Sequence, residues 1–287
     1  MKLGVIGKTG QLGKALAARA PDAIFWGRED LDLSAQADVQ RKAIEKFPNV
    51  DVVILAAADT DVDVAEDNPV SALTVNGIAA GIIATQFMLR SVPVIYVSTD
   101  YVFDGKSRRP YRPKDKVKPL NIYGKSKKMG EQNVMSFGLY NAILRTSWLY
   151  DGTSKNFLTT MLSFKDKDDL RIVNDQIGRP TYAGHLADAV LKLAAGLHQD
   201  PKGNCGIYHA SANGAPVSWH DFAAQIFSSI GGGPNLIPVT TEDYGAPAPR
   251  PKYSVLDNSA FEKRFDHVMP DWTDGLRAAL KEAGYDT

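Results

Sequence analysis

The stretch LGVIGKTGQLG, residues 3–13, joins a short apolar run to three glycines with the spacing Gly-x-x-Gly-x-x-Gly. Glycines allow a tight turn and a close approach of backbone to ligand. A helix that starts there offers free N–H groups and a positive dipole end to a pyrophosphate. Between a strand and a helix, such a loop is typical of dinucleotide-binding folds. We predict cofactor contacts from its residues Gly7, Lys8, Thr9, Gly10, Gln11, Leu12 and Gly13.

Short apolar runs alternate with helical patterns through the first half of the chain. The runs predict buried strands at Leu3–Ile6, Ala23–Trp26, Val52–Ala57, Val94–Ser98 and Ala142–Arg145. The segments between them predict helices at Gln11–Ala20, Ser34–Phe47, Pro69–Arg90 and Asn121–Phe137, the second with Ser34 as its N-cap. This alternation, with right-handed crossovers, predicts the α/β class and a Rossmann-like, doubly wound parallel sheet.

The pattern loosens after residue 150. Helices are expected at Asn156–Phe164, Gly184–Leu197, Trp219–Ile230 and Asp274–Ala283, between loops rich in Pro and Gly. We predict an NAD(P)-binding Rossmann domain over residues 1–153, with segments near 183–210 returning to it. Residues 154–287 are then mainly a smaller, irregular C-terminal substrate domain. The loops 99–120 and 231–255 are long enough to suggest a function of their own.

Composition excludes several classes of function. The 33 basic and 33 acidic residues balance, so nothing indicates nucleic acid or an anionic membrane as a partner. The single cysteine, Cys205, excludes an internal disulfide, and the five histidines are scattered without ligand spacing, so no metal is expected. The N-terminus lacks the apolar region of a signal peptide, and the apolar stretches are shorter than a membrane span. We expect a soluble, cytoplasmic protein.

The end of the second strand bears on the choice of nicotinamide cofactor. NAD sites usually place a carboxylate there for the ribose 2′-hydroxyl, but here Gly27 and Arg28 follow the strand. A guanidinium suits a 2′-phosphate, so we favour NADPH, although an ordinary solvated arginine is the alternative. Asp30 and Asp32 lie close enough to keep NADH use possible. Asp32 and Leu33 join the predicted cofactor contacts.

Two further features complete the cofactor side. The small residues Ala56, Ala57 and Ala58 end the third strand and would let a dinucleotide lie against the backbone, although close packing explains them equally well. Tyr123 and Lys127 have the only Tyr-x-x-x-Lys spacing in the chain, which places both on one helix face. A close ammonium favours phenolate and lowers a tyrosine pKa from about 10, as an acid catalyst requires.

Collinear motifs extend this pattern nearly from end to end. The chain resembles the extended short-chain dehydrogenases/reductases and, within them, the dTDP-4-dehydrorhamnose reductases. The matching segments are GKTGQLG (7–13), AADTDVDVAE (57–66), STDYVFDG (98–105), NIYGKSK (121–127), RTSWLY (145–150), NDQIGRPTYA (174–183) and RP (250–251). The glycine loop and Tyr-x-x-x-Lys belong to the whole superfamily, whereas STDYVFDG, RTSWLY and NDQIGRPT point to the rhamnose-pathway branch.

The resemblance implies a catalytic triad of Thr99, Tyr123 and Lys127. Tyr123 would donate a proton to the sugar's C4 oxygen as a hydride arrives from the nicotinamide. Lys127 would bind the nicotinamide ribose and lower the tyrosine pKa, and both residues would contact the cofactor. Thr99 would hydrogen-bond the C4 oxygen and orient it.

The resemblance also implies contacts to a nucleotide-sugar substrate. Tyr101 and Trp148 offer flat faces for a sugar or base, and Arg250 could pair with a phosphate oxygen. The full set of expected substrate contacts is Val62, Asp63, Thr99, Asp100, Tyr101, Trp148, Asn156, Gln176, Arg179 and Arg250.

The chain departs from the family pattern at four positions. Some relatives form dimers around a metal held by glutamates, where this chain has Ala15 and Gly184. We therefore expect a monomer or a metal-independent homodimer. Asp59 replaces a common histidine and Asp61 a common alanine, which adds negative charge beside the expected sugar pocket.

Four functions are compatible with these motifs. The leading one is NADPH-dependent reduction of the C4 keto group of dTDP-4-dehydro-L-rhamnose to dTDP-L-rhamnose. A second is reduction of another 4-keto-6-deoxy nucleotide sugar. A third is a sugar-nucleotide epimerase or dehydratase, against which Arg28 and RTSWLY speak. The fourth is a non-catalytic partner like the beta subunit of methionine adenosyltransferase, against which the intact triad argues.

Overall fold

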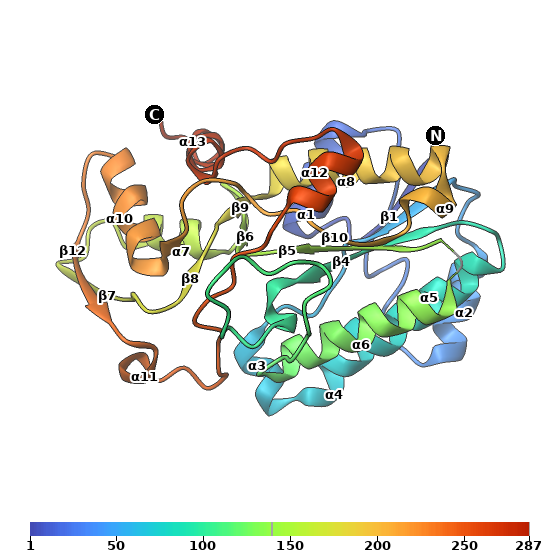
Figure 1. The fold of residues 1–287 in the computed structure, drawn as a ribbon, viewed down its shortest axis with the longest axis horizontal. Coiled ribbons are helices and arrows are strands. Elements are labelled where there is room, and N and C mark those ends of the chain that lie inside the picture. Colours follow the sequence, from blue (N-terminus) through green and yellow to red (C-terminus); the bar gives the residue numbers. More distant parts are fainter. Residues whose placement is uncertain (139, 287) are drawn as a thin grey trace.

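A six-stranded parallel sheet forms the centre of the protein (Figure 1). The computed structural model describes residues 1–138 and 140–286. The strand order is β10-β5-β4-β3-β1-β2, and every neighbouring pair is parallel. The strands are β1 (Leu3–Ile6), β2 (Ile24–Trp26), β3 (Val52–Leu55), β4 (Val94–Thr99), β5 (Ala142–Thr146) and β10 (Gly206–His209). The predicted Rossmann-like α/β class is confirmed.

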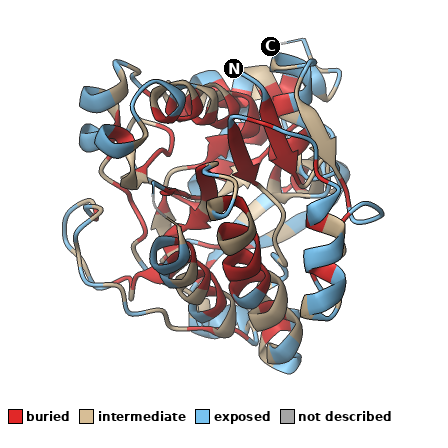
Figure 2. Ribbon diagram, turned by 90° about the vertical axis from the view of Figure 1, so that its right-hand side faces the viewer, coloured by how far each residue is buried: buried red, intermediate tan, exposed pale blue. Residues whose placement is uncertain are grey.

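Helices cover both faces of the sheet and create two separate cores. One face packs on α1 (Gln11–Arg19) and α8 (Ala183–Gln199), with Leu16 and Leu193 fully buried between helix and sheet. The other face packs on α2 (Ala37–Glu45), α5 (Ala79–Met88) and α6 (Ile122–Phe137). Because both faces are covered, strands β1, β3 and β5 are buried along their whole length, as Figure 2 shows.

The start of α2 differs from the prediction. Ser34 does not cap this helix, which begins at Ala37 after Gln36. The backbone N–H and the hydroxyl of Ser34 instead donate to Asp32 Oδ1 at 2.9 and 2.6 Å. This local turn competes with helix formation, and the burial of Leu31 and Leu33 holds the segment against the sheet.

The predicted helix Pro69–Arg90 is not one regular helix. It consists of α4 (Pro69–Ala72), a π-helical turn η1 (Leu73–Ile78) and α5. The run Pro69–Met88 has 20 residues and a mean hydropathy of 1.4, so by length and composition it could cross a membrane. However, 56% of the assessed window is buried inside the fold, where it packs against α6 and the sheet.

The second half of the chain returns to the sheet and then builds a third core. Helix α8 packs on α1, and β10 pairs with β5. Beyond the sheet, α7 (Phe157–Ser163), α10 (Trp219–Ser229) and α13 (Trp272–Glu282) share an apolar cluster. Three short strand pairs complete this part: β6 (Leu149–Tyr150) with β9 (Thr181–Tyr182), β7 (Asp169–Val173) with β12 (Asn235–Val239), and β8 (Ile177–Gly178) with β11 (Val217–Ser218).

Short elements lie within the segments that the sequence presents as loops. The segment 231–255 contains β12 and α11 (Thr241–Tyr244), and the segment 99–120 contains the 3-10 turn η2 (Asp100–Val102). The remaining short helices are α3 (Val62–Asp67), α9 (Pro201–Asn204) and α12 (Ser259–Phe265).

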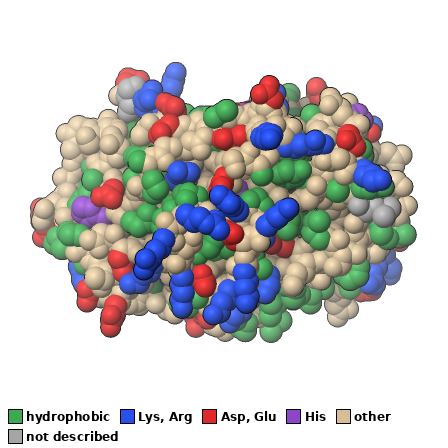
Figure 3. Space-filling view, viewed as in Figure 1, with side chains coloured by type: hydrophobic (Ala, Val, Ile, Leu, Met, Phe, Trp, Pro, Cys, Tyr) green, Lys and Arg blue, Asp and Glu red, His purple; other side chains and the backbone are tan. Residues whose placement is uncertain are grey.

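The loop between η2 and α6 shows how charge is distributed on the surface. Buried Phe103 and Tyr111 anchor it, and their rings stack at a centroid distance of 4.1 Å. Its exposed side chains are mostly cationic, and Lys and Arg side chains gather near the centre of this face in Figure 3. The exposed cations are Lys106, Arg108, Arg109, Arg112, Lys114, Lys116 and Lys118. The neutral total charge is therefore unevenly distributed, and the expected lack of anionic partners remains a prediction.

Candidate active site

A cavity of about 1040 Å³ opens at the carboxyl ends of the sheet strands. It extends from the glycine loop after β1, past the ends of β3 and β4, to α6, and aromatic residues of the second half close its far side. The chain leaves β1 toward β2 on one side and reaches β3, β4 and β5 on the other. Open α/β sheets bind ligands at such a switch point, so the topology and the cavity indicate the same site.

The glycine loop wraps tightly around the end of β1. Gly7 has φ of +112°, and a Cβ there would lie 2.5 Å from the backbone nitrogen of Ala57. A Cβ on Gly13 would lie 2.0 Å from the Gly7 carbonyl oxygen, so only glycine allows this contact between loop and helix. Gly10 is the N-cap of α1 and provides no side-chain acceptor, which leaves first-turn N–H groups free for a ligand.

Most of the predicted cofactor residues line this cavity. Two do not. Gly13 packs beneath the loop, and the Lys8 ammonium forms ion pairs with Glu29 and, at 3.7 Å, with Asp30. The residues that do line it are Gly7, Thr9, Gly10, Gln11, Leu12, Arg28, Asp32, Leu33, Ala56, Ala57, Ala58, Tyr123 and Lys127.

The Arg28 side chain lies at the cofactor end and is 80% exposed. Its Nε is 3.5 Å from Asp32 Oδ1, and its Nη2 donates to Ser34 Oγ at 3.3 Å. The Asp30 carboxylate accepts from the Gly27 N–H at 2.8 Å, so it is committed to the backbone at the end of β2. An exposed guanidinium and a hydroxyl therefore lie together near the end of the second strand.

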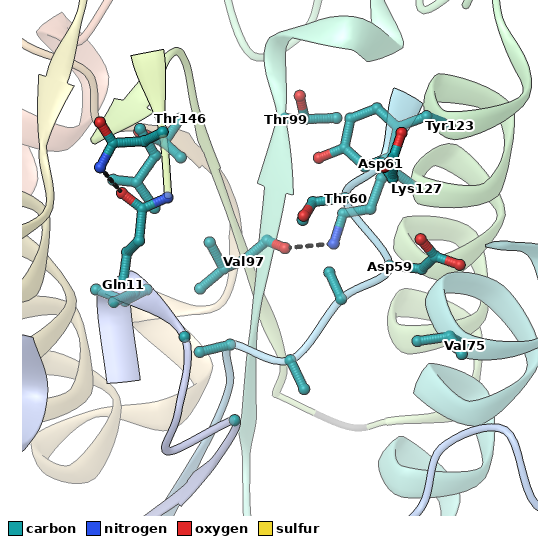
Figure 4. A pocket seen from close by; sticks show the side chains of 18 of the residues that line it. Gln11, Asp59, Thr60, Asp61, Val75, Val97, Thr99, Tyr123, Lys127 and Thr146 are labelled. Carbon is teal, nitrogen blue, oxygen red and sulfur yellow. Dashed lines mark hydrogen bonds between the residues drawn. The ribbon is translucent and has the colours of Figure 1, made fainter. Parts of the chain in front are cut away.

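Helix α6 places Tyr123 beside the end of β4. Asn121 caps the helix by accepting from the Gly124 N–H at 2.7 Å. A Cβ on Gly124 would lie 2.2 Å from the Tyr101 carbonyl oxygen, so glycine lets the first helical turn contact η2. The rings of Tyr101 and Tyr123 meet edge to face at 5.7 Å. In Figure 4 the Tyr123 side chain lies close to Thr99, and Lys127 lies one turn further along the helix.

Lys127 is nearly inaccessible to solvent, at 2% exposure. Its ammonium donates to the Val97 carbonyl oxygen at 2.7 Å and lies 4.0 Å from the centroid of the Tyr96 ring (Figure 4). Burial lowers the pKa of Lys127 to about 7, and the Glu131 charge opposes this shift. Glu131 in turn forms a buried bidentate ion pair with Arg145, with an N–O distance of 2.7 Å.

The pKa of Tyr123 differs from the sequence expectation. Burial raises it, the charges of Asp100 and Asp59 act in the same direction, and the Thr99 hydroxyl opposes them. The lowering expected from Lys127 is absent because the lysine is itself desolvated and bonded to β4. The tyrosine is therefore a neutral phenol in this structure and is suited to donate a proton.

A buried asparagine in the π-helical turn joins the segments of the site. Asn76 Nδ2 donates to the Asp59 carbonyl oxygen at 2.8 Å and to Ser126 Oγ at 2.9 Å. The backbone carbonyl oxygen of Asn76 accepts a hydrogen bond from the Tyr96 hydroxyl at 2.8 Å. Asn76 was not predicted as a site residue, because hydrophobic periodicity does not reveal a π-turn inside an apolar helix.

The two unusual aspartates have different environments. Asp61 caps α3, accepting from the Val64 N–H at 3.1 Å, so its presence has a structural reason. Asp59 accepts from Ser71 Oγ at 2.9 Å. Both line the cavity, but only Asp59 acts on the pKa of Tyr123.

Two stacked tryptophans form the far wall of the cavity. The rings of Trp148 and Trp219 are nearly parallel, with centroids 3.5 Å apart, and Phe157 lies 4.5 Å from Trp219. Trp148 has φ of +48°, an unusual conformation for this residue type, and its indole fits over Gly178 where no Cβ is present. The sequence analysis missed Trp219, although it directly follows the helix cap Ser218.

The other predicted substrate residues divide into two groups. Val62, Thr99, Asp100, Tyr101, Trp148 and Asn156 line the cavity. The remaining four, Asp63, Gln176, Arg179 and Arg250, lie outside its lining.

The four outside residues bond to other parts of the chain, and one of them, Gln176, contacts the tryptophan wall. Gln176 accepts from the Trp219 indole N–H at 3.2 Å, and the Arg179 guanidinium donates to the Leu256 carbonyl oxygen at 3.5 Å. Arg250 donates to Asp63 at 2.7 Å across 187 residues of chain. In this structure Arg250 is paired with a carboxylate, and its expected contact with a phosphate stays a prediction.

Comparison with known proteins agrees with this geometry. The family model for the RmlD substrate binding domain matches residues 1–284. The dTDP-4-dehydrorhamnose reductase of Burkholderia thailandensis is 37% identical over 287 residues, covering 95% of both chains. The chain belongs to the dTDP-4-dehydrorhamnose reductase family. This is a family of oxidoreductases, and the resemblance drawn from the motifs is confirmed.

Two further proteins match this chain over nearly its full length. The spore coat polysaccharide biosynthesis protein SpsK of Bacillus subtilis is 38% identical, covering 98% of this chain and 97% of that protein. The crystal structure of dTDP-4-dehydrorhamnose reductase from Bacillus anthracis, in complex with NADP, superposes with a TM-score of 0.89 at 34% identity. It covers 98% of this chain and 99% of that one.

Ala15 and Gly184, the positions where some relatives are expected to carry metal-binding glutamates, both lie beside Arg19 here. A Cβ on Gly184 would lie 2.6 Å from Arg19 Nη2, and the Arg19 Nε donates to Asp188 Oδ1 at 2.7 Å. Within residues 1–138 and 140–286, no cluster of three or more His, Cys, Asp or Glu side chains could hold a metal ion. The oligomeric state remains a prediction.

Proposed function

We propose that this protein reduces the C4 keto group of dTDP-4-dehydro-L-rhamnose to give dTDP-L-rhamnose, with NADPH as the reductant. The observation that carries the proposal is the shared cavity. The predicted triad Thr99, Tyr123 and Lys127 lines the same space as the glycine loop and the tryptophan wall. A dinucleotide and a sugar nucleotide can therefore meet beside Tyr123.

The cavity residues fit a nicotinamide dinucleotide. The uncapped first turn of α1 supports a pyrophosphate, and Ala56–Ala58 leave room along the end of β3. Bound NADPH would supply the hydride to C4 of the sugar. Arg28 and Ser34 lie together at the opposite end, where a guanidinium and a hydroxyl would bind a 2′-phosphate. Asp32 lies at the same place and is paired with Arg28, so NADH use also remains compatible with the site.

The triad supplies the proton and orients the ketone. Tyr123, a neutral phenol, donates its proton to the C4 oxygen as that oxygen becomes an alcohol. Thr99 is a second donor to the same oxygen and fixes its position. Lys127 is held by the Val97 carbonyl oxygen one helical turn away, lines the same cavity, and is proposed to bind the nicotinamide ribose.

The tryptophan wall is proposed to bind the nucleotide or sugar part of the substrate. Trp148 and Trp219 present flat, rigid faces, and α7 begins beside them at Asn156. Asn156 Nδ2 is also 3.3 Å from Gln11 Oε1, so it links the substrate wall to the glycine loop.

A second candidate is reduction of another 4-keto-6-deoxy nucleotide sugar. Asp59 favours it, because this carboxylate lines the cavity beside the triad where the family commonly has histidine. The test is to follow NADPH oxidation with dTDP- and UDP-linked 4-keto sugars and to identify the product. Faster turnover of the rhamnose precursor supports the first candidate, and exclusive use of a different sugar supports the second.

A further inference from the structure

Asp100 directly follows Thr99 and lies buried at the edge of the cavity. Asp100 is only 2% exposed, and its Oδ1 is 3.1 Å from Thr99 Oγ1. Its Oδ2 is buried and has no hydrogen-bond partner among the described residues. An ionised carboxylate with a dry, unpaired oxygen is costly, whereas a neutral acid tolerates the same place more easily.

The hydrogen-bond capacity of Thr99 makes the state of Asp100 important. A hydroxyl has one proton and two lone pairs. One lone pair of Thr99 Oγ1 accepts from the Tyr101 N–H at 3.2 Å. If Asp100 is ionised it can only accept, so the Thr99 proton is used on Asp100 Oδ1 and only a lone pair remains for the cavity. A keto oxygen is also an acceptor, so Thr99 could not bind it.

We propose that Asp100 is a positioning residue whose neutral form donates to Thr99 Oγ1 and thereby directs the Thr99 proton toward the keto oxygen. Both lone pairs of Thr99 are then occupied, by Tyr101 N–H and by Asp100, and its proton is free. The keto oxygen accepts one bond from Thr99 and one from Tyr123. This inference rests on the proposed function, because it concerns the ketone reduced at that site.

The charged surroundings support a neutral Asp100. Burial raises the pKa of Asp100 to about 7, and the hydroxyls of Ser254 and Thr99 partly offset this rise. Tyr101 and Tyr123 face it from η2 and α6 as neutral phenols. The Arg250 guanidinium lies beyond Tyr101 but is neutralised by Asp63. Asp59, a second carboxylate that lines the cavity, acts on the pKa of Tyr123.

Three variants of the full-length protein test the proposal. Asp100→Asn keeps a donor that can bind Thr99, Asp100→Leu removes it at similar volume, and Asp104→Asn is a matched control on the same loop outside the cavity lining. The ratio kcat/KM for the keto sugar is measured against pH for each. At one pH unit below 7, we expect Asp100→Asn to retain activity within about tenfold of wild type, whereas Asp100→Leu loses about 100-fold or more.

The pH profile separates positioning from a structural role. Lys127 and Asp100 both titrate near pH 7, so activity of the wild type should fall above this pH with the loss of two protons. The activity of Asp100→Asn should fall with the loss of one proton. Equal losses in the Asn and Leu variants, or unchanged steepness in Asp100→Asn, would overturn the proposal.

Thermal unfolding tests the neutral state without any turnover. A carboxyl whose folded pKa is raised stabilises the protein fully below its unfolded value of 3.8, and this contribution is lost as pH rises toward about 7. The Tm of Asp100→Asn relative to wild type should therefore rise across this window, while Asp104→Asn shows no such trend. Parallel Tm curves would overturn the neutral state. If wild type reduces no keto sugar, the proposed function and the positioning role both fail, whereas the Tm comparison still decides the neutral state.

Discussion

The Lys127 ammonium donates to the Val97 carbonyl oxygen at 2.7 Å, which ties α6 to the interior of β4 one helical turn beyond Tyr123. The bond explains how a buried lysine is held in place while its phenolic neighbour faces the cavity. It also places a cation with a lowered pKa next to the site of proton transfer. The consequences for stability and activity can be measured.

Substitution of Lys127 should change how stability depends on pH. The folded protein holds this lysine with a pKa of about 7, against 10.5 for the free side chain. The unfolded state therefore binds more protons between these values, and this residue makes stability rise with pH across the window. Urea unfolding should show that Lys127→Met gains stability relative to wild type near pH 7 and loses this advantage near pH 10.5. The exposed Lys125→Met variant is the control, and parallel curves for wild type and Lys127→Met would contradict the account.

The buried pair Glu131–Arg145 should contribute strongly to stability. Arg145 is 2% exposed and donates two hydrogen bonds to Glu131, which also accepts from Ser98 Oγ at 2.6 Å. Glu131→Gln leaves the guanidinium without its counter-charge, and we expect a loss of about 3–5 kcal/mol in the free energy of unfolding. Asp274→Asn breaks the exposed pair with Arg277 and should cost no more than about 1 kcal/mol. Similar losses for the two variants would show that the buried pair has no special role.

Removal of the Trp219 ring should weaken substrate binding and leave cofactor binding unchanged. Its stacking on Trp148 holds the far wall of the cavity flat. Loss of an aromatic pair costs about 0.5–1.5 kcal/mol, so Trp219→Ala should raise KM for the sugar nucleotide roughly 2- to 12-fold. Trp219→Phe should have a smaller effect. An unchanged KM, or an equal loss of NADPH affinity measured by cofactor fluorescence, would argue against a substrate wall.

Arg28 should set the preference between the two nicotinamide cofactors. Its guanidinium is largely exposed and shares Ser34 and Asp32 as partners, so it can turn to a 2′-phosphate. Arg28→Ala should raise KM for NADPH by about tenfold and leave KM for NADH nearly unchanged, because only NADPH carries the added phosphate. Asp32→Ala, which frees the guanidinium, should lower KM for NADPH. An equal rise for both cofactors would exclude this role.

The parallel sheet was predictable because each strand has one dominant signal. Val52–Leu55 is buried on both faces and reads as a continuous apolar run, and the glycine loop marks the first turn. Local interactions that compete with helix formation were harder to predict from the sequence. The Asp32–Ser34 turn moved the start of α2, and the π-turn η1 interrupts the predicted helix at Asn76 and Gly77.

The wall of the candidate site depended on contacts between distant parts of the chain. Trp219 reaches Trp148 because β11 pairs with β8, whose Gly178 lies under the Trp148 indole, and Arg250 reaches Asp63 across 187 residues. The spacing of residues along the chain does not indicate such long-range pairs. The resemblance to known reductases indicated Trp148 and Arg250 as substrate residues, but only the fold shows that Arg250 faces Asp63 and lies outside the cavity lining.

The most direct test of the proposed function is to mix NADPH and dTDP-4-dehydro-L-rhamnose with wild type or Tyr123→Phe. The loss of nicotinamide absorbance measures the oxidation of NADPH. Wild type should consume NADPH in step with formation of dTDP-L-rhamnose. Tyr123→Phe should bind NADPH normally and lose about 100- to 10,000-fold in kcat, because it lacks the proton donor. No NADPH consumption by wild type, or near-wild-type turnover by Tyr123→Phe, would contradict the account.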